Sequence, residues 1–264
     1  MQSLVRHLHA FATDVRLTQD EWTAAIDILK TTGDITDEKR SEFILWSDAL
    51  GISSLVDSLA NPFPPQAMES TVLGPFWTPN APQRDFAESM IERPLGIPAL
   101  VHGYVRDLQG GPIAGAELDV WQNDADGLYT VQAPESDQDH LRGRFFSRAD
   151  GAYAFVGVRP IPYTIPHDGP VGAMLEAAQR HPWRPAHIHM IVTAPGFQRL
   201  QTHIFDSTSQ YLDSDAVFAV KRSLIRTFVP RSADDPKRPA SIEQGEWCSV
   251  ENNIVLAPVE NGRA

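Results

Sequence analysis

The sequence feature that most constrains the fold is a series of short β-type segments that begins after residue 66. Each segment is rich in branched and aromatic residues and is followed by a turn-forming stretch such as "LQGGP" or "NDADG". Strands this short, at hairpin-length spacing and without regularly alternating helices, are typical of an antiparallel β-sandwich. The predicted strands are "ALVHGYVRD", "AELDVWQ", "GRFFS", "AYAFVGV", "AHIHMIV", "LQTHIF" and the late "WCSVENNIVLA".

The residues before this series have the periodicity of helices instead. Thr18 and Glu21 form a capping box ahead of the second of four predicted helices, and Thr36 is the predicted cap of the third. The run "NPFPP" at 61–65 then stops helix formation. The apolar stripes of the four helices comprise Leu4, Leu8, Phe11 and Val15; Trp22, Ala25, Ile26 and Leu29; Phe43, Trp46 and Leu50; and Ile52, Leu55, Val56 and Leu59.

We therefore predict a helical region over residues 1–66 and a β-sandwich domain over residues 67–264. Two further helices are expected inside the second region, at 169–181 and near 214–225. The four N-terminal helices carry more apolar surface than so small a group can bury internally. We expect them to pack on the sandwich, on a second subunit, or on both.

Composition excludes several classes of protein. The formal net charge is −12 with no basic cluster, which argues against a nucleic-acid partner. No apolar run approaches the roughly 18 residues that a membrane span needs, and no signal-peptide pattern is present. The single cysteine, Cys248, cannot form an internal disulfide, so we predict the reducing cytoplasm as the compartment.

Two histidines lie two residues apart in the predicted strand "AHIHMIV". Because side chains alternate along a strand, His187 and His189 share one face. The opposite face carries Ile188, Met190 and Val192, which suit a core. The pair is either half of a metal site or two buried histidines that only satisfy hydrogen bonds. Histidine pairs suit zinc, copper, iron or nickel, and the other ligands decide between these metals.

The residues alone leave those other ligands open. With one cysteine a thiolate zinc site is excluded, whereas a distant carboxylate would point to ferrous iron. Tyrosine is the other possibility. Tyr129 follows the turn "NDADG" and Tyr163 stands between prolines, so neither belongs to an alternating strand. A phenol, with a pKa of about 10, ionises at neutral pH only beside a strong Lewis acid such as ferric iron.

Several separated motifs occur together in the order found in one family. The chain resembles the intradiol ring-cleavage dioxygenases, non-haem ferric enzymes that open catechols between their two hydroxyl groups. The resemblance extends from "SLVRHLHAF" to about residue 230. The motifs that carry it are "ESTVLGPFW", "GAELDVWQNDADGLY", "LRGRFFS", "RPIPYTIPHDGPVG" and "HPWRPAHIHMIVTAPGF".

The resemblance implies a ligand set and a catalytic residue. The positions that match the metal ligands of the family are Tyr129, Tyr163, His187 and His189, which would hold one Fe(III) per chain. Tyr163 matches the ligand that substrate displaces and would then act as a general base. Arg184 would stabilise carbanion character of the ring by its fixed charge, the alternative being an ordinary surface guanidinium.

Within the family, the motifs look most like those of enzymes that cleave hydroxyquinol, benzene-1,2,4-triol. His203 stands where catechol and chlorocatechol enzymes usually carry Gln, and its own role is left open. The implied reaction inserts both atoms of O₂ and gives 3-hydroxy-cis,cis-muconate, a tautomer of maleylacetate, in aromatic catabolism. Catechol or chlorocatechol is the alternative substrate. The positions that match the substrate pocket are Leu45, Asp48, Val72, Leu73, Gly74, Pro75, Phe76, Ile165, Pro166, Arg184 and Val217.

Some of these pocket residues have plain alternative explanations. Gly74 and Pro75 would let the backbone approach a flat ring, against which Phe76 packs. Asp48, taken alone, is more often a solvated charge on a helix surface. In the pocket, it would accept a hydrogen bond from the third hydroxyl group of a triol.

The resemblance also implies an assembly, and two rival functions stay in view. The helices of residues 1–66 would form a homodimer interface, which holds a lipid in some relatives. Relatives generally carry a further helical segment ahead of "MQSLVRHLHAF", which bears on the details of that interface. One rival is a zinc or ferrous site made of His187, His189 and an acid. The other is a non-catalytic β-sandwich module that binds sugars.

Overall fold

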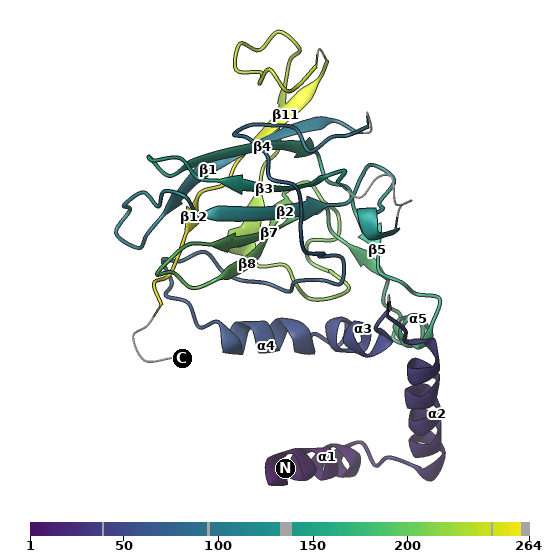
Figure 1. Ribbon diagram of the computed structural model, residues 1–264. Coiled ribbons are helices and arrows are strands. Elements are labelled where there is room, and N and C mark those ends of the chain that lie inside the picture. The colour runs from purple at the N-terminus through teal and green to yellow at the C-terminus, as the bar shows by residue number, and fades with distance from the viewer. Residues whose placement is uncertain (39, 94–95, 133–138, 244, 260–264) are drawn as a thin grey trace.

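Two five-stranded sheets form the body of the protein in the computed structural model, which describes residues 1–38, 40–93, 96–132, 139–243 and 245–259. One sheet has the order β10-β11-β1-β12 with β4 paired to β1, and the other has the order β3-β2-β7-β8-β9. A separate ribbon joins β5 and β6 (Figure 1). The strands are β1 (Pro98–Arg106), β2 (Glu117–Gln122), β3 (Arg142–Phe146), β4 (Ala152–Val158), β5 (Tyr163–Thr164), β6 (Trp183–Arg184), β7 (His187–Thr193), β8 (Leu200–Asp206), β9 (Ile225–Arg226), β10 (Val229–Arg231), β11 (Trp247–Glu251) and β12 (Ile254–Val255).

Strand pairing confirms the sandwich but is not antiparallel throughout. The pairs β2–β3, β2–β7, β7–β8 and β1–β4 are antiparallel, whereas β9 joins β8 in parallel. The predicted segment "WCSVENNIVLA" supplies both β11 and β12, which run parallel to β1 in one constant register. Parallel partners cannot be joined by a tight hairpin, so this late segment reaches β1 from a distant part of the chain.

The main apolar core lies between the two sheets and follows the alternation of each strand. Ile191 lies on the other face of β7 and belongs to a separate cluster with Trp121, Tyr129 and Tyr163. That outer face also carries the two histidines of β7, so alternation places the polar pair beside the tyrosines and away from the core. The inward residues of β7 are Ile188, Met190 and Val192, as predicted.

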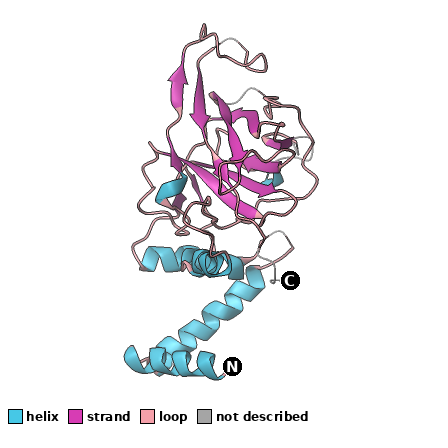
Figure 2. Ribbon diagram, turned by 90° about the vertical axis from the view of Figure 1, so that its left-hand side faces the viewer, coloured by secondary structure: helices cyan, strands magenta, loops and turns pink. Residues whose placement is uncertain are grey.

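The helices lie on one side of the sandwich. α3 and α4 run beneath it, α2 leads away from it, and α1 stands clear of it (Figures 1 and 2). The predicted capping box is present, because the Thr18 side chain accepts the Glu21 N–H and Glu21 accepts the Thr18 N–H. The α-helices are α1 (Gln2–Asp14), α2 (Gln19–Ile35), α3 (Glu42–Ala49), α4 (Ile52–Ala60) and α5 (Pro170–Ala177), and short 3₁₀ turns span Thr130–Gln132 and Arg222–Leu224.

Two details of the helix prediction are wrong. The N-cap of α3 is Ser41, which accepts the Ile44 N–H, whereas Thr36 ends α2 and its hydroxyl only assists by accepting the Glu42 N–H at 3.2 Å. The helix expected near 214–225 is a series of turns that ends in a 3₁₀ turn. There the Asp215 carboxylate accepts the Ala219 N–H, which in a helix would donate to the Asp215 carbonyl instead. The helix expected at 169–181 is present as α5.

No single helix among the described residues is long and apolar enough to cross a bilayer. In the part of the chain that the structure describes, α3 and α4 taken together are the one pair that reaches the required length and composition, and the chain bends by 79° between them.

Candidate metal and substrate site

Three histidines cover one face of the β7–β8 pair. His187 and His189 come from β7, and His203 on β8 stands directly opposite His189. The Nε2 atoms of His187 and His189 are 3.0 Å apart, and the His203 ring centroid lies 4.2 Å from that of His189. All three side chains are buried. In the described part of the chain they are the one group of His, Cys, Asp or Glu side chains with the spacing of metal ligands.

Burial and one backbone acceptor set the protonation of these rings. The Nδ1 of His187 is 2.7 Å from the Pro185 carbonyl oxygen, which can only accept, so Nδ1 carries the proton and Nε2 the lone pair. Burial lowers the pKa of His187 and His189 far below the ordinary value, and the charge of Arg184 lowers it further. Both rings are therefore neutral at physiological pH, which is the form that binds a metal.

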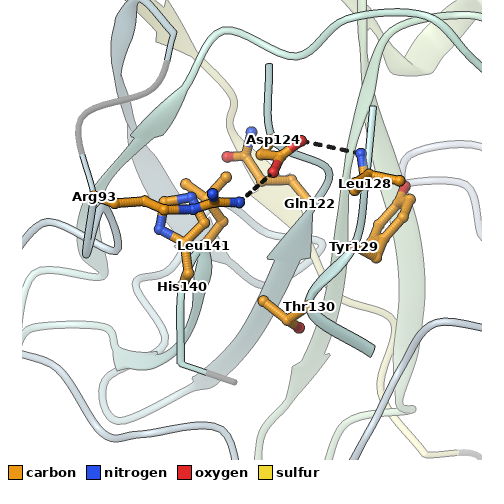
Figure 3. Close-up of a pocket in the computed structure, with 8 residues that line it drawn as sticks. All are labelled: Arg93, Gln122, Asp124, Leu128, Tyr129, Thr130, His140 and Leu141. Atoms are coloured by element: carbon orange, nitrogen blue, oxygen red, sulfur yellow. Dashed lines mark hydrogen bonds and ion pairs between the residues drawn. The ribbon is translucent and has the colours of Figure 1, made fainter. Parts of the chain in front are cut away.

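Tyr129, which contacts His189, follows a turn that one carboxylate, Asp124, organises. Figure 3 shows the bonds of Asp124 to Leu128 and Arg93. Asp124 accepts the N–H groups of Asp126 at 2.9 Å and Leu128 at 3.0 Å through one oxygen. Its other oxygen accepts the guanidinium of Arg93 at 2.8 Å. This turn is the predicted "NDADG" turn, and its hydrogen bonds fix the direction in which the chain presents Tyr129.

The phenol of Tyr129 is held among aromatic rings. Its hydroxyl oxygen lies 2.9 Å from Nε2 of His189, and Phe76 stacks on its ring at a centroid distance of 4.4 Å. Burial, and then the neighbouring phenol of Tyr163, raise the pKa of Tyr129 well above its ordinary value. A phenolate at this position therefore requires a strong positive charge beside it.

Tyr163 and Arg184 face each other across the β5–β6 ribbon. The Nη1 of Arg184 donates to the Tyr163 hydroxyl at 3.2 Å. Burial alone would lower the pKa of Arg184, but the neighbouring Tyr163 and Asp215 outweigh it and raise that pKa. The Arg184 side chain is only 2% exposed, so the alternative of a surface guanidinium is wrong. The buried guanidinium places a permanent positive charge beside the tyrosines.

The segment "VLGPF" (72–76) packs against His189 and the tyrosine cluster. Gly74 has φ +75°, and a Cβ there would lie 3.2 Å from Cε1 of His189, so glycine alone fits without strain. The flat ring that this backbone approaches in the structure is thus an imidazole. Leu73 packs against the tyrosine cluster, Pro75 is exposed, and Val72 belongs to the main core.

Leu45 and Asp48 lie on the buried side of α3, each 7% exposed. Asp48 is therefore not a solvated helix charge. Burial raises the pKa of this carboxyl, while a hydrogen bond with Ser53 and the charge of Arg184 partly offset that increase. Asp48 thus lies within electrostatic range of the guanidinium. Ile165 and Val217 are buried in the main core, and Pro166 is half-buried.

Two buried residues at the site, Trp121 and Asp215, are not predicted by the sequence. Trp121 stands opposite His189 in the β2–β7 register and stacks on it at 4.8 Å. Asp215 accepts the Nε of Arg184 at 3.2 Å. Trp121 lies inside the motif "GAELDVWQNDADGLY", but nothing in that motif marks it as a site residue, because strand pairing brings it to the site, as a turn far along the chain brings Asp215. His203 was noticed, but only strand pairing shows that it joins the histidine cluster.

Comparison with known proteins gives the class that this fold and site define. The family model described as "Dioxygenase" matches residues 72–256, and the one described as "Catechol dioxygenase N terminus" matches residues 1–67. The chain belongs to the intradiol ring-cleavage dioxygenases. Membership of an enzyme family argues against the non-catalytic sugar-binding module.

Three similar proteins place the chain within the family. A hydroxyquinol 1,2-dioxygenase of Rhodococcus opacus is 46% identical over 98% of this chain and 86% of its own length. A 6-chlorohydroxyquinol 1,2-dioxygenase of Cupriavidus pinatubonensis is 47% identical over 87% of this chain and 83% of its own. The solved structure of hydroxyquinol 1,2-dioxygenase from Pseudomonas putida DLL-E4 superposes with a TM-score of 0.93, at 46% identity, over 98% of this chain and 90% of that one.

Proposed function

We propose that this enzyme is a hydroxyquinol 1,2-dioxygenase with one non-haem ferric ion per chain. It would cleave benzene-1,2,4-triol between carbons 1 and 2 with O₂ and give 3-hydroxy-cis,cis-muconate, a tautomer of maleylacetate. The observation that carries the proposal is that two phenols, one from a turn and one from β5, meet the two imidazoles of β7 in one buried place. The Tyr163 ring centroid lies 5.3 Å from that of Tyr129 and 5.5 Å from that of His187. The proposed ligands are Tyr129, Tyr163, His187 and His189.

The donor set fits ferric iron better than the rival metals. Phenol oxygens that ionise are hard anionic ligands, and neutral imidazoles complete the set. Contacts of 2.9 Å from Tyr129 to His189 and 3.0 Å from His187 to His189 are close enough for these atoms to share one ion. Within the described residues no carboxylate joins the histidine group, which disfavours the zinc or ferrous site with an acid.

Each residue would have a distinct part in the reaction. Ferric iron, when bound, would stabilise the phenolates and make a coordinated diol reactive towards oxygen. Tyr163 would accept a proton from the diol at its hydroxyl oxygen as a general base. Arg184 already donates to that oxygen, so its positive charge is in place to stabilise negative charge on the substrate. Tyr129, stacked on Phe76, would stay a ligand throughout.

The choice of the triol over catechol rests on Asp48 and on the relatives. A buried carboxylate that meets a substrate hydroxyl discriminates against the analogue that lacks it, because its own acceptor is then left unpaired. Asp48→Ala should lower kcat/KM for hydroxyquinol by roughly ten- to a hundredfold and for catechol much less. Asp57→Ala is the matched control, since that carboxylate on α4 binds Ser70 and Lys221 instead.

Oxygen uptake and metal analysis test the function directly. We expect about one iron per chain, a visible phenolate-to-iron absorption band, and oxygen consumption with hydroxyquinol faster than with catechol or chlorocatechol. A colourless, fully active protein would refute the metal assignment. Faster oxygen uptake with catechol or chlorocatechol would support the alternative substrate.

We further propose that the helical region makes a homodimer in which each chain keeps its own complete site. α1 and α2 stand clear of the sandwich (Figure 2). Their apolar stripes are exposed, as is that of α4. A second copy of this chain offers matching stripes under two-fold symmetry. Sedimentation should show a dimer, and a concentration-independent monomer would exclude it. A lipid extracted from the purified protein would show that the stripes hold lipid as well.

We also infer that the enzyme works in the cytoplasm. The single cysteine, Cys248, is buried and free, which suits a reducing compartment. Recovery of the activity in the cytoplasmic fraction of the source cells would test this location.

A further inference from the structure

One buried carboxylate outside the proposed ligand set binds two parts of the site at once. Asp215 Oδ1 accepts the Nε of Arg184 at 3.2 Å and the N–H of Val217 at 3.3 Å, while Oδ2 accepts the N–H of Ala219 at 3.0 Å. Asp215 and Arg184 are each only 2% exposed. We propose that Asp215 is a positioning residue, which orients the Arg184 guanidinium towards Tyr163 and fixes the turn that carries Val217.

The shape of the guanidinium makes this orientation specific. Its nitrogens lie in one rigid plane, so a bond that fixes Nε also fixes the directions of Nη1 and Nη2. Nη1 donates to the Tyr163 hydroxyl, and Nη2 is buried with no hydrogen-bond partner in the described part of the chain. An unpaired buried donor beside the reacting groups is available to a substrate oxygen or to developing negative charge. Asp215 therefore determines where that donor points.

The turn held by Asp215 adopts a conformation that needs support. Phe218 has φ +56°, in the left-handed region that bulky residues rarely enter. The Phe218 N–H donates to the Asp215 carbonyl at 3.1 Å, and the Phe218 carbonyl accepts the Ser54 hydroxyl at 2.9 Å. With the carboxylate bonds on either side of it, this backbone is fixed at several points. These bonds hold Val217 in its buried position.

A double-mutant cycle separates positioning from general support of the fold. This inference rests on the proposed function, because the cycle is measured with hydroxyquinol. Asp215→Asn removes the charge that Arg184 binds and puts an NH2 group in place of one accepting oxygen, so it also loses a backbone bond to Val217 or to Ala219. The cycle cancels that backbone loss, because it is present in both backgrounds. We expect it to lower kcat by about ten- to a hundredfold, with KM changing much less. In an Arg184→Gln background the same change should lower kcat by less than about threefold.

The outcomes distinguish the two roles. If Asp215 acts only as structural support, Asp215→Asn lowers kcat by the same factor in both backgrounds, and that result would overturn the proposal. Asp206→Asn is the matched control, because Asp206 is also buried and accepts the Nε–H of Arg159, not of Arg184, at 2.8 Å. We expect that variant to lose thermal stability and to keep kcat within about twofold of wild type.

Two further arms keep the proposal open to refutation. If Asp215→Asn does not fold, Asp215→Glu carries the same cycle, because it keeps the charge but displaces the carboxylate. If wild type cleaves no diol, the proposed function fails, and the cycle is measured as the affinity of the iron-loaded protein for 4-nitrocatechol without oxygen. Non-additive losses of affinity then support positioning by Asp215, and additive losses or no binding overturn it.

Discussion

The β-sandwich buries its apolar residues in a core, whereas α1, α2 and α4 of the N-terminal region leave theirs exposed. In the sandwich even polar side chains such as His187, His189 and Arg184 are buried. In the helical region α1 has no buried residue and α2 buries only Thr32, although both carry an apolar stripe. Burial stabilises by roughly 25 cal/mol per Å² of apolar surface, so an exposed stripe contributes nothing until something covers it. The proposed catalytic groups are thus gathered within one chain, whereas the helices have surface left for a partner.

The largest expected effect on activity comes from a substitution in the buried site of the sandwich. Tyr129→Phe removes one proposed anionic ligand without changing the ring that stacks on Phe76. We expect loss of most bound iron and of the visible band, and a fall in kcat of at least about a thousandfold. Iron analysis, absorption spectra and oxygen uptake measure this.

A matched control is available in the same domain. Tyr153 is also buried, and its hydroxyl donates to the Asn252 carbonyl at 2.6 Å in a different part of the sandwich. Tyr153→Phe should cost about 1 kcal/mol of stability and leave the iron in place. Equal iron content in both variants would contradict the proposed ligand set.

The next effect concerns the exposed stripe of α1. Phe11, 59% exposed, lies on that stripe, and Phe11→Asp would bring two charges into a two-fold interface, one from each copy. We expect the dissociation constant of the dimer, measured by sedimentation equilibrium, to rise by at least about a hundredfold, with the visible band unchanged. His9→Asp, on α1 but outside the stripe, is the control. A dimer unaffected by Phe11→Asp would show that α1 is not at the interface.

A third prediction tests the junction between the two regions. Glu42 of α3 is fully buried, binds Arg40, and accepts the N–H of Val171 in the first turn of α5 at 3.0 Å. Because Glu42→Ala leaves both donors without this acceptor, we expect a loss of about 2–3 kcal/mol in urea unfolding. Asp168→Asn, which removes an exposed partner of Arg40, should cost less than about 1 kcal/mol. Similar losses in both would show that the junction gains nothing from burial.

The smallest effect concerns Asp48, the polar residue that α3 buries. Burial raises its pKa, so the folded state holds this proton more tightly than the unfolded chain does. The carboxylate therefore destabilises the fold at neutral pH, and this penalty disappears as the pH falls below about 4. Asp48→Asn should raise the unfolding temperature slightly at pH 7, with the gain shrinking towards acid pH. A gain that grows on acidification would contradict this sign.

Much of the sandwich could be predicted because its signals are local. The segments that became β1, β2, β3, β4, β7 and β8 have ends within a residue of those predicted, since alternation and turn residues act over a few positions. The helix expected near 214–225 failed for a nonlocal reason. Asp215 is buried against Arg184, and its carboxylate binds the backbone of the turn in place of a helical ladder.

The sequence by itself determined which face of β7 carries the histidines, because the two-residue repeat of a strand is fixed by backbone geometry. It also supplied, through motif order, the tyrosines and the arginine of the candidate site, and the ligand set stays a prediction. Only the tertiary structure placed Arg184 opposite Tyr163, His203 opposite His189, and Asp215 behind the guanidinium. Strand register and long-range turns decide such contacts, and they depend on how all the segments pack together, which no short stretch of sequence encodes.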